Sequence, residues 1–179
     1  IGRHGTEAFE RVRDYAVANG ASGDINFWHE IVACYHARSG APDAEPSLGE
    51  KCEAALVSMG EKGFYPSRRA IMQCVQCRVR QCDKQNDAAS LGRAANLLEE
   101  CWSKYGRNAS DRPAFGDVLE RLLKIGSEDA KSAALSLCAS YLVTNSLSKE
   151  SVSQMSKEDV KRIVFDAEFT VDQLCAGGL

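Results

Sequence analysis

The stretch CVQCRVRQC carries three thiols at close spacing, those of Cys74, Cys77 and Cys82, which raises the question of metal or redox chemistry. A structural zinc site needs four ligands arranged as a tetrahedron, and CxxC units that bind zinc usually lie on turns. This stretch instead has the pattern of a helix, which places Cys74 and Cys77 on one face, and the next suitable thiol, Cys101, is a full helix away. We therefore predict packing thiols here, with a zinc site or a dithiol redox site as the alternatives.

The chain holds eight cysteines in all, at positions 34, 52, 74, 77, 82, 101, 138 and 175. Such a number is typical of secreted, disulfide-linked scaffolds. A chain of 179 residues with a full set of apolar side chains does not need cross-links, and most of these cysteines occupy apolar positions of helical patterns. We predict reduced, buried thiols, and a disulfide framework is the alternative.

Histidines and basic residues are the other side chains that could bind ligands or take part in a reaction. His4, His29 and His36 offer no ligand pair, and we expect His29 and His36 on helix surfaces. A local basic stretch is formed by Arg68, Arg69, Arg78, Arg80 and Lys84. It could meet phosphate or an acidic protein surface, or simply face solvent. No glycine-rich phosphate loop, GxSxG elbow or HExxH motif occurs, so we expect neither an enzyme nor a cofactor or metal site.

Length and charge limit the classes of protein that fit. A chain of 179 residues is one domain or a short repeat array. The net charge of −3 lacks the electrostatic signature of a dedicated nucleic-acid binder. No apolar run of about 18 residues predicts a membrane span. The sequence begins at Ile1 rather than at a methionine, so we expect a processed chain whose targeting peptide lies outside this sequence.

The elements that must position these residues are predicted to be helices, most of them ending at a glycine. The predicted ranges are 7–19, 27–38, 47–62, 68–82, 91–105, 111–126, 128–144 and a closing helix over 156–175. Ser47 with Glu50, and Ser156 with Asp159, are predicted capping boxes at helix starts. Loops 40–47 and 83–90 are predicted between helices.

The helix ends recur at a fixed spacing. Gly20, Gly63 and Gly106 are 43 residues apart, and Asn145 follows 39 residues later, each predicted in the left-handed cap position. The apolar register before each cap recurs as well. Four residues before it stand Ala16, Met59, Trp102 and Tyr141; eight before, Val12, Ala55, Leu98 and Leu137; eleven before, Phe9, Cys52, Ala95 and Ala134. Trp28, Ile71 and Phe115 align upstream. The sequence therefore predicts an array of helix–turn–helix units.

The stretch MGEKGFYPS, residues 59–67, resembles the end of a pentatricopeptide (PPR) repeat, in which Met59, Gly63, Pro66 and Ser67 match the family pattern. The stretch WHEIVACY, residues 28–35, resembles the first helix of such a repeat. The resemblance implies an all-α fold, a short solenoid of antiparallel helix pairs with a C-terminal capping helix. The implied boundaries are a half repeat at 1–24, repeats at about 25–67, 68–111 and 112–150, and the capping helix at 156–175.

The family usually binds single-stranded RNA, one base per repeat, through two positions of each unit. By resemblance, the first of these positions falls on His29, Met72 and Gly116, and the second on Ser67 and Asp111. Met72 and Gly116 cannot hydrogen-bond a base edge through a side chain, so only His29 with Ser67 could read a base. An organellar RNA-binding or mitoribosomal protein is therefore the alternative, with Arg68, Arg69, Arg78 and Arg80 as further contacts to RNA or to a partner.

With the base-reading positions degenerate, the resemblance implies a non-catalytic interaction subunit of a large complex in the mitochondrial matrix, with the α-subunit of the ATP synthase as the expected partner. The first unit lacks a leading helix, which leaves an end for a partner to cover. The residues expected to define the repeats are Gly20, Met59, Gly63, Pro66, Trp102, Gly106 and Asn145.

Overall fold

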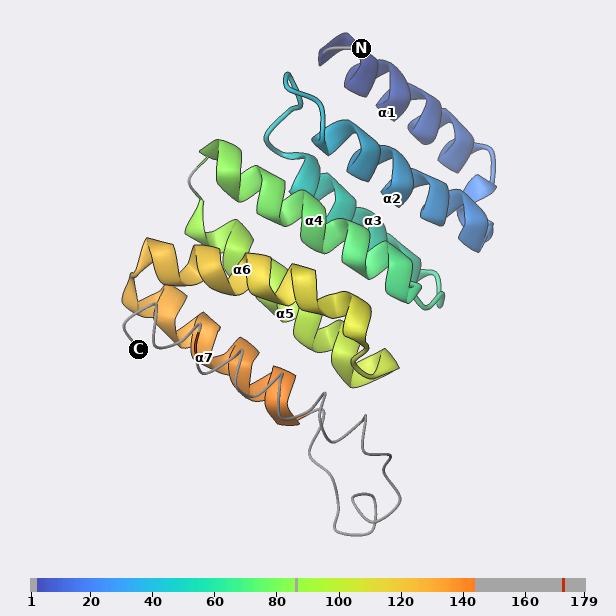
Figure 1. Ribbon diagram of the computed structural model, residues 1–179. Helices are drawn as coiled ribbons and strands as arrows, with labels where there is room; N and C mark the ends of the chain where they lie inside the picture. The colour runs from blue at the N-terminus through green and yellow to red at the C-terminus, as the bar shows by residue number, and fades with distance from the viewer. Residues whose placement is uncertain (1–2, 86, 144–171, 173–179) are drawn as a thin grey trace, which may run out of the picture. The chain divides into compact units, whose positions relative to one another are not determined.

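The structure is a computed structural model that describes residues 3–85, 87–143 and 172 (Figure 1). Within these residues every regular element is a helix, which confirms the all-α prediction for this part of the chain. The helices are α1 (Arg3–Ala18), α2 (Ile25–Ser39), α3 (Leu48–Glu61), α4 (Arg68–Gln85), α5 (Ala88–Tyr105), α6 (Arg112–Ile125) and α7 (Glu128–Val143), with short 3-10 turns η1 (Ala21–Gly23) and η2 (Ala109–Asp111). The chain divides into two compact units, Ile1–Leu97 and Leu98–Leu179, and the boundary falls inside α5.

The first unit is built around α2, α3 and α4, each of which packs against the other two. Their apolar faces meet in a core that includes Trp28, Val32, Tyr35, Cys52 and Met59, all buried. Helix α1 lies beside α2, where the ring of Phe9 meets the edge of Tyr35 at a centroid distance of 5.3 Å (Figure 1). Burial of these side chains removes apolar surface from water and holds the helices together.

The second unit is organised around an aromatic cluster. Phe115 of α6 stacks on Tyr141 of α7 with ring centroids 3.9 Å apart, and Trp102 of α5 meets Tyr141 at 5.3 Å. All three rings are buried. Aromatic contacts of this kind add to the stabilisation from area burial alone, so they fix how α6 and α7 pack against the end of α5.

The predicted glycine caps are present. The backbone φ angles are 91° at Gly20, 78° at Gly63 and 69° at Gly106, all in the left-handed region. A further left-handed glycine, Gly126, ends α6 with φ 68°. The fourth predicted cap, Asn145, lies outside the described residues. The spacing of glycines along the chain was therefore a sound guide to where α1, α3 and α5 end.

The cap at Gly63 closes α3 with two crossing hydrogen bonds. The amide of Phe64 donates to the carbonyl of Met59 at 2.9 Å, and that of Gly63 donates to Gly60 at 2.9 Å, which is the Schellman arrangement. Gly106 uses the simpler form, with its amide bonded to the carbonyl of Trp102 at 2.8 Å. In both cases the left-handed residue satisfies carbonyls that the helix end would otherwise leave unpaired.

The predicted apolar register is confirmed for the three later caps and is wrong at Val12. The side chains four, eight and eleven residues before Gly63 and Gly106, and those before position 145, are buried: Met59, Trp102, Tyr141, Ala55, Leu98, Leu137, Cys52, Ala95 and Ala134. In α1, Phe9 and Ala16 are only half-buried and Val12 is 66% exposed. The same position that is covered in the later helices is open to solvent in α1.

Two local predictions are corrected. Ser47 does not form a capping box with Glu50, because its hydroxyl donates to Glu45 at 2.5 Å instead. The predicted loop at 83–90 is mostly helical, since α4 continues to Gln85 and α5 begins at Ala88. The extra length of this unit therefore lies in its helices. The capping box at Ser156 and the closing helix at 156–175 fall outside the described residues.

Candidate interaction surfaces

A polar groove between α2 and α4 brings His29 and Ser67 together. The groove has a volume of about 330 Å³, with His29 contributed by α2 and Ser67 by the turn that leads into α4. The remaining lining residues are Asn26, Glu30, Ala33, Arg69, Ala70 and Gln73. Two residues that are 38 positions apart in the sequence, and that the sequence singled out as a pair, thus line one surface.

The polar side-chain atoms of Ser67 and His29 differ in their hydrogen bonding. The Ser67 hydroxyl accepts a hydrogen bond from the amide of Ala70 at 3.2 Å, so it caps the start of α4. The Nε2 atom of His29 is buried and has no hydrogen-bond partner among the described residues. A buried polar atom left unpaired costs about 1–3 kcal/mol. The groove therefore contains one satisfied and one unsatisfied polar group.

The basic stretch of α4 does not form one surface, because its helical spacing separates the side chains. Arg69 is exposed and lines the groove. Arg78 is buried and its Nη2 lies 2.5 Å from Glu53 Oε2 in an ion pair. Arg80 donates to the Ser39 hydroxyl at 2.9 Å, and Lys84 donates to the carbonyl of Ala41 at 3.0 Å. Arg68 is half-buried at the start of the helix.

Glu53 is the residue of this network that the sequence did not reveal. Its carboxylate accepts from Arg78 Nε at 2.9 Å and from Arg93 Nε at 2.9 Å, so it joins α3 to α4 and α5 within the first unit. Burial by itself raises the pKa of Glu53, but hydrogen bonds from Arg93 and Arg78 outweigh burial and hold that pKa below its ordinary value. A carboxylate between two arginines keeps its charge and stabilises the packing of the three helices.

The other positions that the resemblance assigned to base reading are buried or half-buried. Asp111 is 1% exposed, and its Oδ2 accepts from the indole Nε1 of Trp102 at 3.1 Å and from the amide of Asn108 at 3.0 Å. Met72 and Gly116 are half-buried. Asp111 thus serves the turn between α5 and α6, whereas His29 and Ser67 line a groove together.

The exposed side of α1 carries two large apolar side chains among charged ones. Val12 is 66% exposed and Tyr15 is 72% exposed, and their separation of three residues puts them on one side of the helix. Arg11 and Asp14 are exposed beside them. Scattered apolar residues are normal on a protein surface. Val12 differs from them because the equivalent positions in α3, α5 and α7 are buried.

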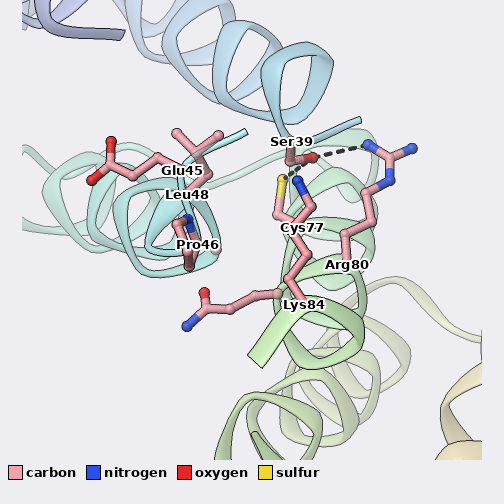
Figure 2. A pocket seen from close by; sticks show the side chains of 9 residues that line it. Ser39, Glu45, Pro46, Leu48, Cys77, Arg80 and Lys84 are labelled. Atoms are coloured by element: carbon pink, nitrogen blue, oxygen red, sulfur yellow. Dashed lines mark hydrogen bonds between the residues drawn. The ribbon is translucent and has the colours of Figure 1, made fainter. Parts of the chain in front are cut away.

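The cysteines occupy the core. The described ones carry free thiols, and all of these are buried except Cys34, which is half-buried. No group of three or more histidines, cysteines or carboxylates in residues 3–85 and 87–143 has the geometry of a metal site. A small cavity of about 10 Å³ lies beside Cys77, lined also by Ser39, Arg80 and Lys84 (Figure 2).

No family model, curated protein or solved structure matches this chain. The fold and the surfaces described above therefore carry the functional argument. Across the described part of the chain, no helix combines the length and the apolar character that crossing a membrane would require.

Proposed function

We propose that this chain is a non-catalytic, PPR-like interaction subunit of a large complex in the mitochondrial matrix. The described elements are consecutive helices, and α2 packs on α3 and α6 on α7, which supports a short solenoid of helix–turn–helix units. Solenoids of this kind bury each unit against its neighbours and offer extended surfaces to partners. The resemblance of residues 28–35 and 59–67 to PPR repeats supports the same architecture.

The observation that carries this proposal is the exposure of two large apolar side chains, Val12 and Tyr15, on α1. In α3, α5 and α7 the corresponding positions, Ala55, Leu98 and Leu137, are at most 4% exposed, whereas Val12 is 66% exposed. Covering Val12 and Tyr15 would stabilise a complex by about 25 cal/mol for each Å² of apolar surface removed from water. The occupant that fits is a protein segment with apolar side chains, flanked by charges that complement Arg11 and Asp14.

The partner that we propose is the α-subunit in the catalytic head of the mitochondrial ATP synthase. In length and in repeat number this chain is similar to the small PPR-type accessory subunit of the euglenozoan-type ATP synthase. The proposal predicts that the protein co-purifies stoichiometrically with the α- and β-subunits. Isolation of the native protein as a free, RNA-bound monomer would contradict it.

A pair of matched substitutions tests the surface itself. Val12→Asp places a charge on the exposed side of α1, and Val57→Asp places one at an equally solvent-exposed valine on α3, 56% exposed. We expect Val12→Asp to lower co-purification with the complex at least tenfold and Val57→Asp to leave it unchanged. Equal behaviour of the two variants, with unchanged helical content, would show that α1 is not the interface.

Binding of single-stranded RNA is the second candidate, favoured by the groove that His29, Ser67 and Arg69 share. Histidine and serine can hydrogen-bond a base edge, and arginine can pair with phosphate. Fluorescence anisotropy with a labelled oligoribonucleotide tests this candidate. Submicromolar, salt-sensitive binding that Arg69→Glu abolishes and Lys62→Glu, at an exposed lysine beyond α3, does not, would favour RNA over a protein partner.

A further inference from the structure

The side-chain amide of Gln81, on α4, is satisfied at one end only. The residue is 3% exposed. Its Nε2 donates to Glu50 Oε1 at 3.1 Å and to Gln85 Oε1 at 3.2 Å. Its Oε1 is buried and has no hydrogen-bond partner among the described residues. Buried amide oxygens in folded proteins normally accept a hydrogen bond from the protein or from an ordered water, so this oxygen points to a ligand that can donate one.

The orientation of this amide follows from its neighbour Glu50. The Glu50 carboxylate forms an ion pair with Arg78 at 3.9 Å, and an ionised carboxylate accepts hydrogen bonds but cannot donate them. Turning the amide over would place Gln81 Oε1 against the Glu50 carboxylate, oxygen against oxygen. The Oε1 atom is therefore held against Gly49, where it would be the first atom that a side chain at position 49 meets.

Gln81 and Gly49 also line a cavity of about 10 Å³, together with Ser39 of α2 and with Arg80 and Lys84 of α4 (Figure 2). One water molecule needs about 10–15 Å³ of such space, so a single water fits and a larger ligand does not. Glycine at position 49 keeps this space available, because a Cβ there would take up the room beside the amide oxygen.

The wall of the cavity supplies the partners that a buried water requires. Lys84 Nζ donates to the carbonyl of Ala41 at 3.0 Å and to that of Ala44 at 3.4 Å. An ammonium group has three N–H bonds, so one remains to donate to a water. The other partner is Gln81 Oε1, which accepts. Two partners meet the lower limit for an ordered buried water.

We propose that this cavity is a binding site for one structural water molecule, which donates a hydrogen bond to Gln81 Oε1 and accepts one from Lys84 Nζ. Because Lys84 also bonds to the carbonyls of Ala41 and Ala44, the water joins the buried amide of α4 to the loop between α2 and α3. A cation of similar size, such as ammonium, is disfavoured by the positive charges of Arg80 and Lys84 in the wall.

A crystal structure of the full chain, at a resolution that shows ordered waters, tests the site directly. We expect one water at about 2.7–3.2 Å from Gln81 Oε1 and within hydrogen-bond distance of Lys84 Nζ. A cavity without water density, or a Gln81 Oε1 that accepts from a protein donor instead, would overturn the proposal.

Overhauser spectra between water and the isotope-labelled protein test the site in solution. We expect cross-peaks from water to the protons of Gly49, with NOE and ROE of opposite sign, as for a bound water. Gln81→Met keeps the length of the side chain and removes the acceptor, so it should abolish these cross-peaks. Gln76→Met is the matched control, at an exposed glutamine of the same helix, and should retain them.

The origin of the cross-peaks decides the outcome. Cross-peaks that survive in Gln81→Met would arise from the exchanging protons of Lys84 or Ser39 and would contradict the proposal. Their loss in Gln81→Met and retention in Gln76→Met would support it. If Gln81→Met fails to fold, the crystal structure of the wild-type protein decides the question alone.

Discussion

The indole Nε1 of Trp102 donates a hydrogen bond of 3.1 Å to Oδ2 of Asp111, and both side chains are buried. The same oxygen accepts the amide of Asn108 at 3.0 Å, while Asn108 Oδ1 accepts the amide of Ser110 at 2.8 Å. The turn between α5 and α6 is therefore organised by one carboxylate that also orients the largest ring of the aromatic cluster.

Asp111→Ala is predicted to destabilise the protein by about 2–3 kcal/mol, because it leaves the buried indole N–H of Trp102 and a backbone amide without their acceptor. Urea denaturation followed by tryptophan fluorescence measures this loss. Asp117→Ala is the matched control, since Asp117 forms an exposed ion pair with Arg121 one turn away and should cost less than about 0.5 kcal/mol. Similar costs for the two variants would show that the bond to Trp102 contributes little.

Alanine at Gly63 and at Gly60 is predicted to act in opposite directions. Gly63 has φ 78° and Gly60 lies within α3, yet an added Cβ meets nothing within 4 Å at either residue, so packing does not distinguish them. Gly63→Ala should cost about 1 kcal/mol through backbone strain, and Gly60→Ala should gain about 0.5–1 kcal/mol through helix propensity. Thermal melts of both variants check the signs, and a stabilising Gly63→Ala would refute the left-handed cap.

Glu53→Gln is predicted to lower stability by about 3 kcal/mol at pH 7, because Arg78, whose side chain is only 10% exposed, keeps only the longer ion pair with Glu50 at 3.9 Å. The pKa of Glu53 is lowered by folding, so its contribution is complete above the unfolded pKa of about 4.3 and disappears as the pH falls through the lower folded value. The stability difference between wild type and variant should therefore shrink below about pH 4.3. Chemical denaturation at several pH values measures this difference.

Arg93→Gln provides the control for that experiment. The side chain of Arg93 binds the same carboxylate but is 46% exposed, so solvent replaces much of the lost interaction. Its cost should be under about 1 kcal/mol. If Arg93→Gln were as damaging as Glu53→Gln, the buried partner Arg78 would not be the source of the effect.

Gly49→Ala is predicted to destabilise the protein although it replaces glycine inside a helix. An added Cβ would lie 2.4 Å from Gln81 Oε1 and 3.3 Å from the Cα atom of Arg78, so α3 and α4 would have to move apart. The expected cost is about 1–2 kcal/mol, more than the gain in helix propensity. Gly60→Ala again serves as the reference, and a gain in melting temperature for Gly49→Ala would exclude close packing at this crossing.

Much of the fold could be predicted because helix ends depend on local chemistry. Gly20, Gly63 and Gly106 occupy left-handed positions that few other residues adopt, so their spacing located three helix ends. Burial was predicted equally well wherever a helix is covered by neighbours. It failed at Val12 because periodicity shows which side chains share a face and cannot show whether another element covers that face.

The site was harder to predict because its residues meet through tertiary packing. His29 and Ser67, which the resemblance pairs, line one groove, and Asp111, which it places at the second base-reading position, is bonded to Trp102 in the core. The closely spaced arginines in the sequence suggested one basic surface. On helix α4, however, they point in different directions, and Arg78 is buried in an ion pair with Glu53.

The attachment of α1 has a consequence for motion. Among the described side chains of this helix Thr6 alone is buried. Besides the ring contact of Phe9 with Tyr35, α1 is held by polar contacts: Arg38 Nε to Thr6 at 3.0 Å, Lys51 Nζ to Glu10 at 2.8 Å, and Arg13 to the hydroxyl of Tyr35. Because α1 buries little apolar surface, its local unfolding should cost little free energy. The amides of α1 should therefore exchange with deuterium well before those of α3 and α4. Binding of a partner over Val12 and Tyr15 should therefore slow the exchange of these amides.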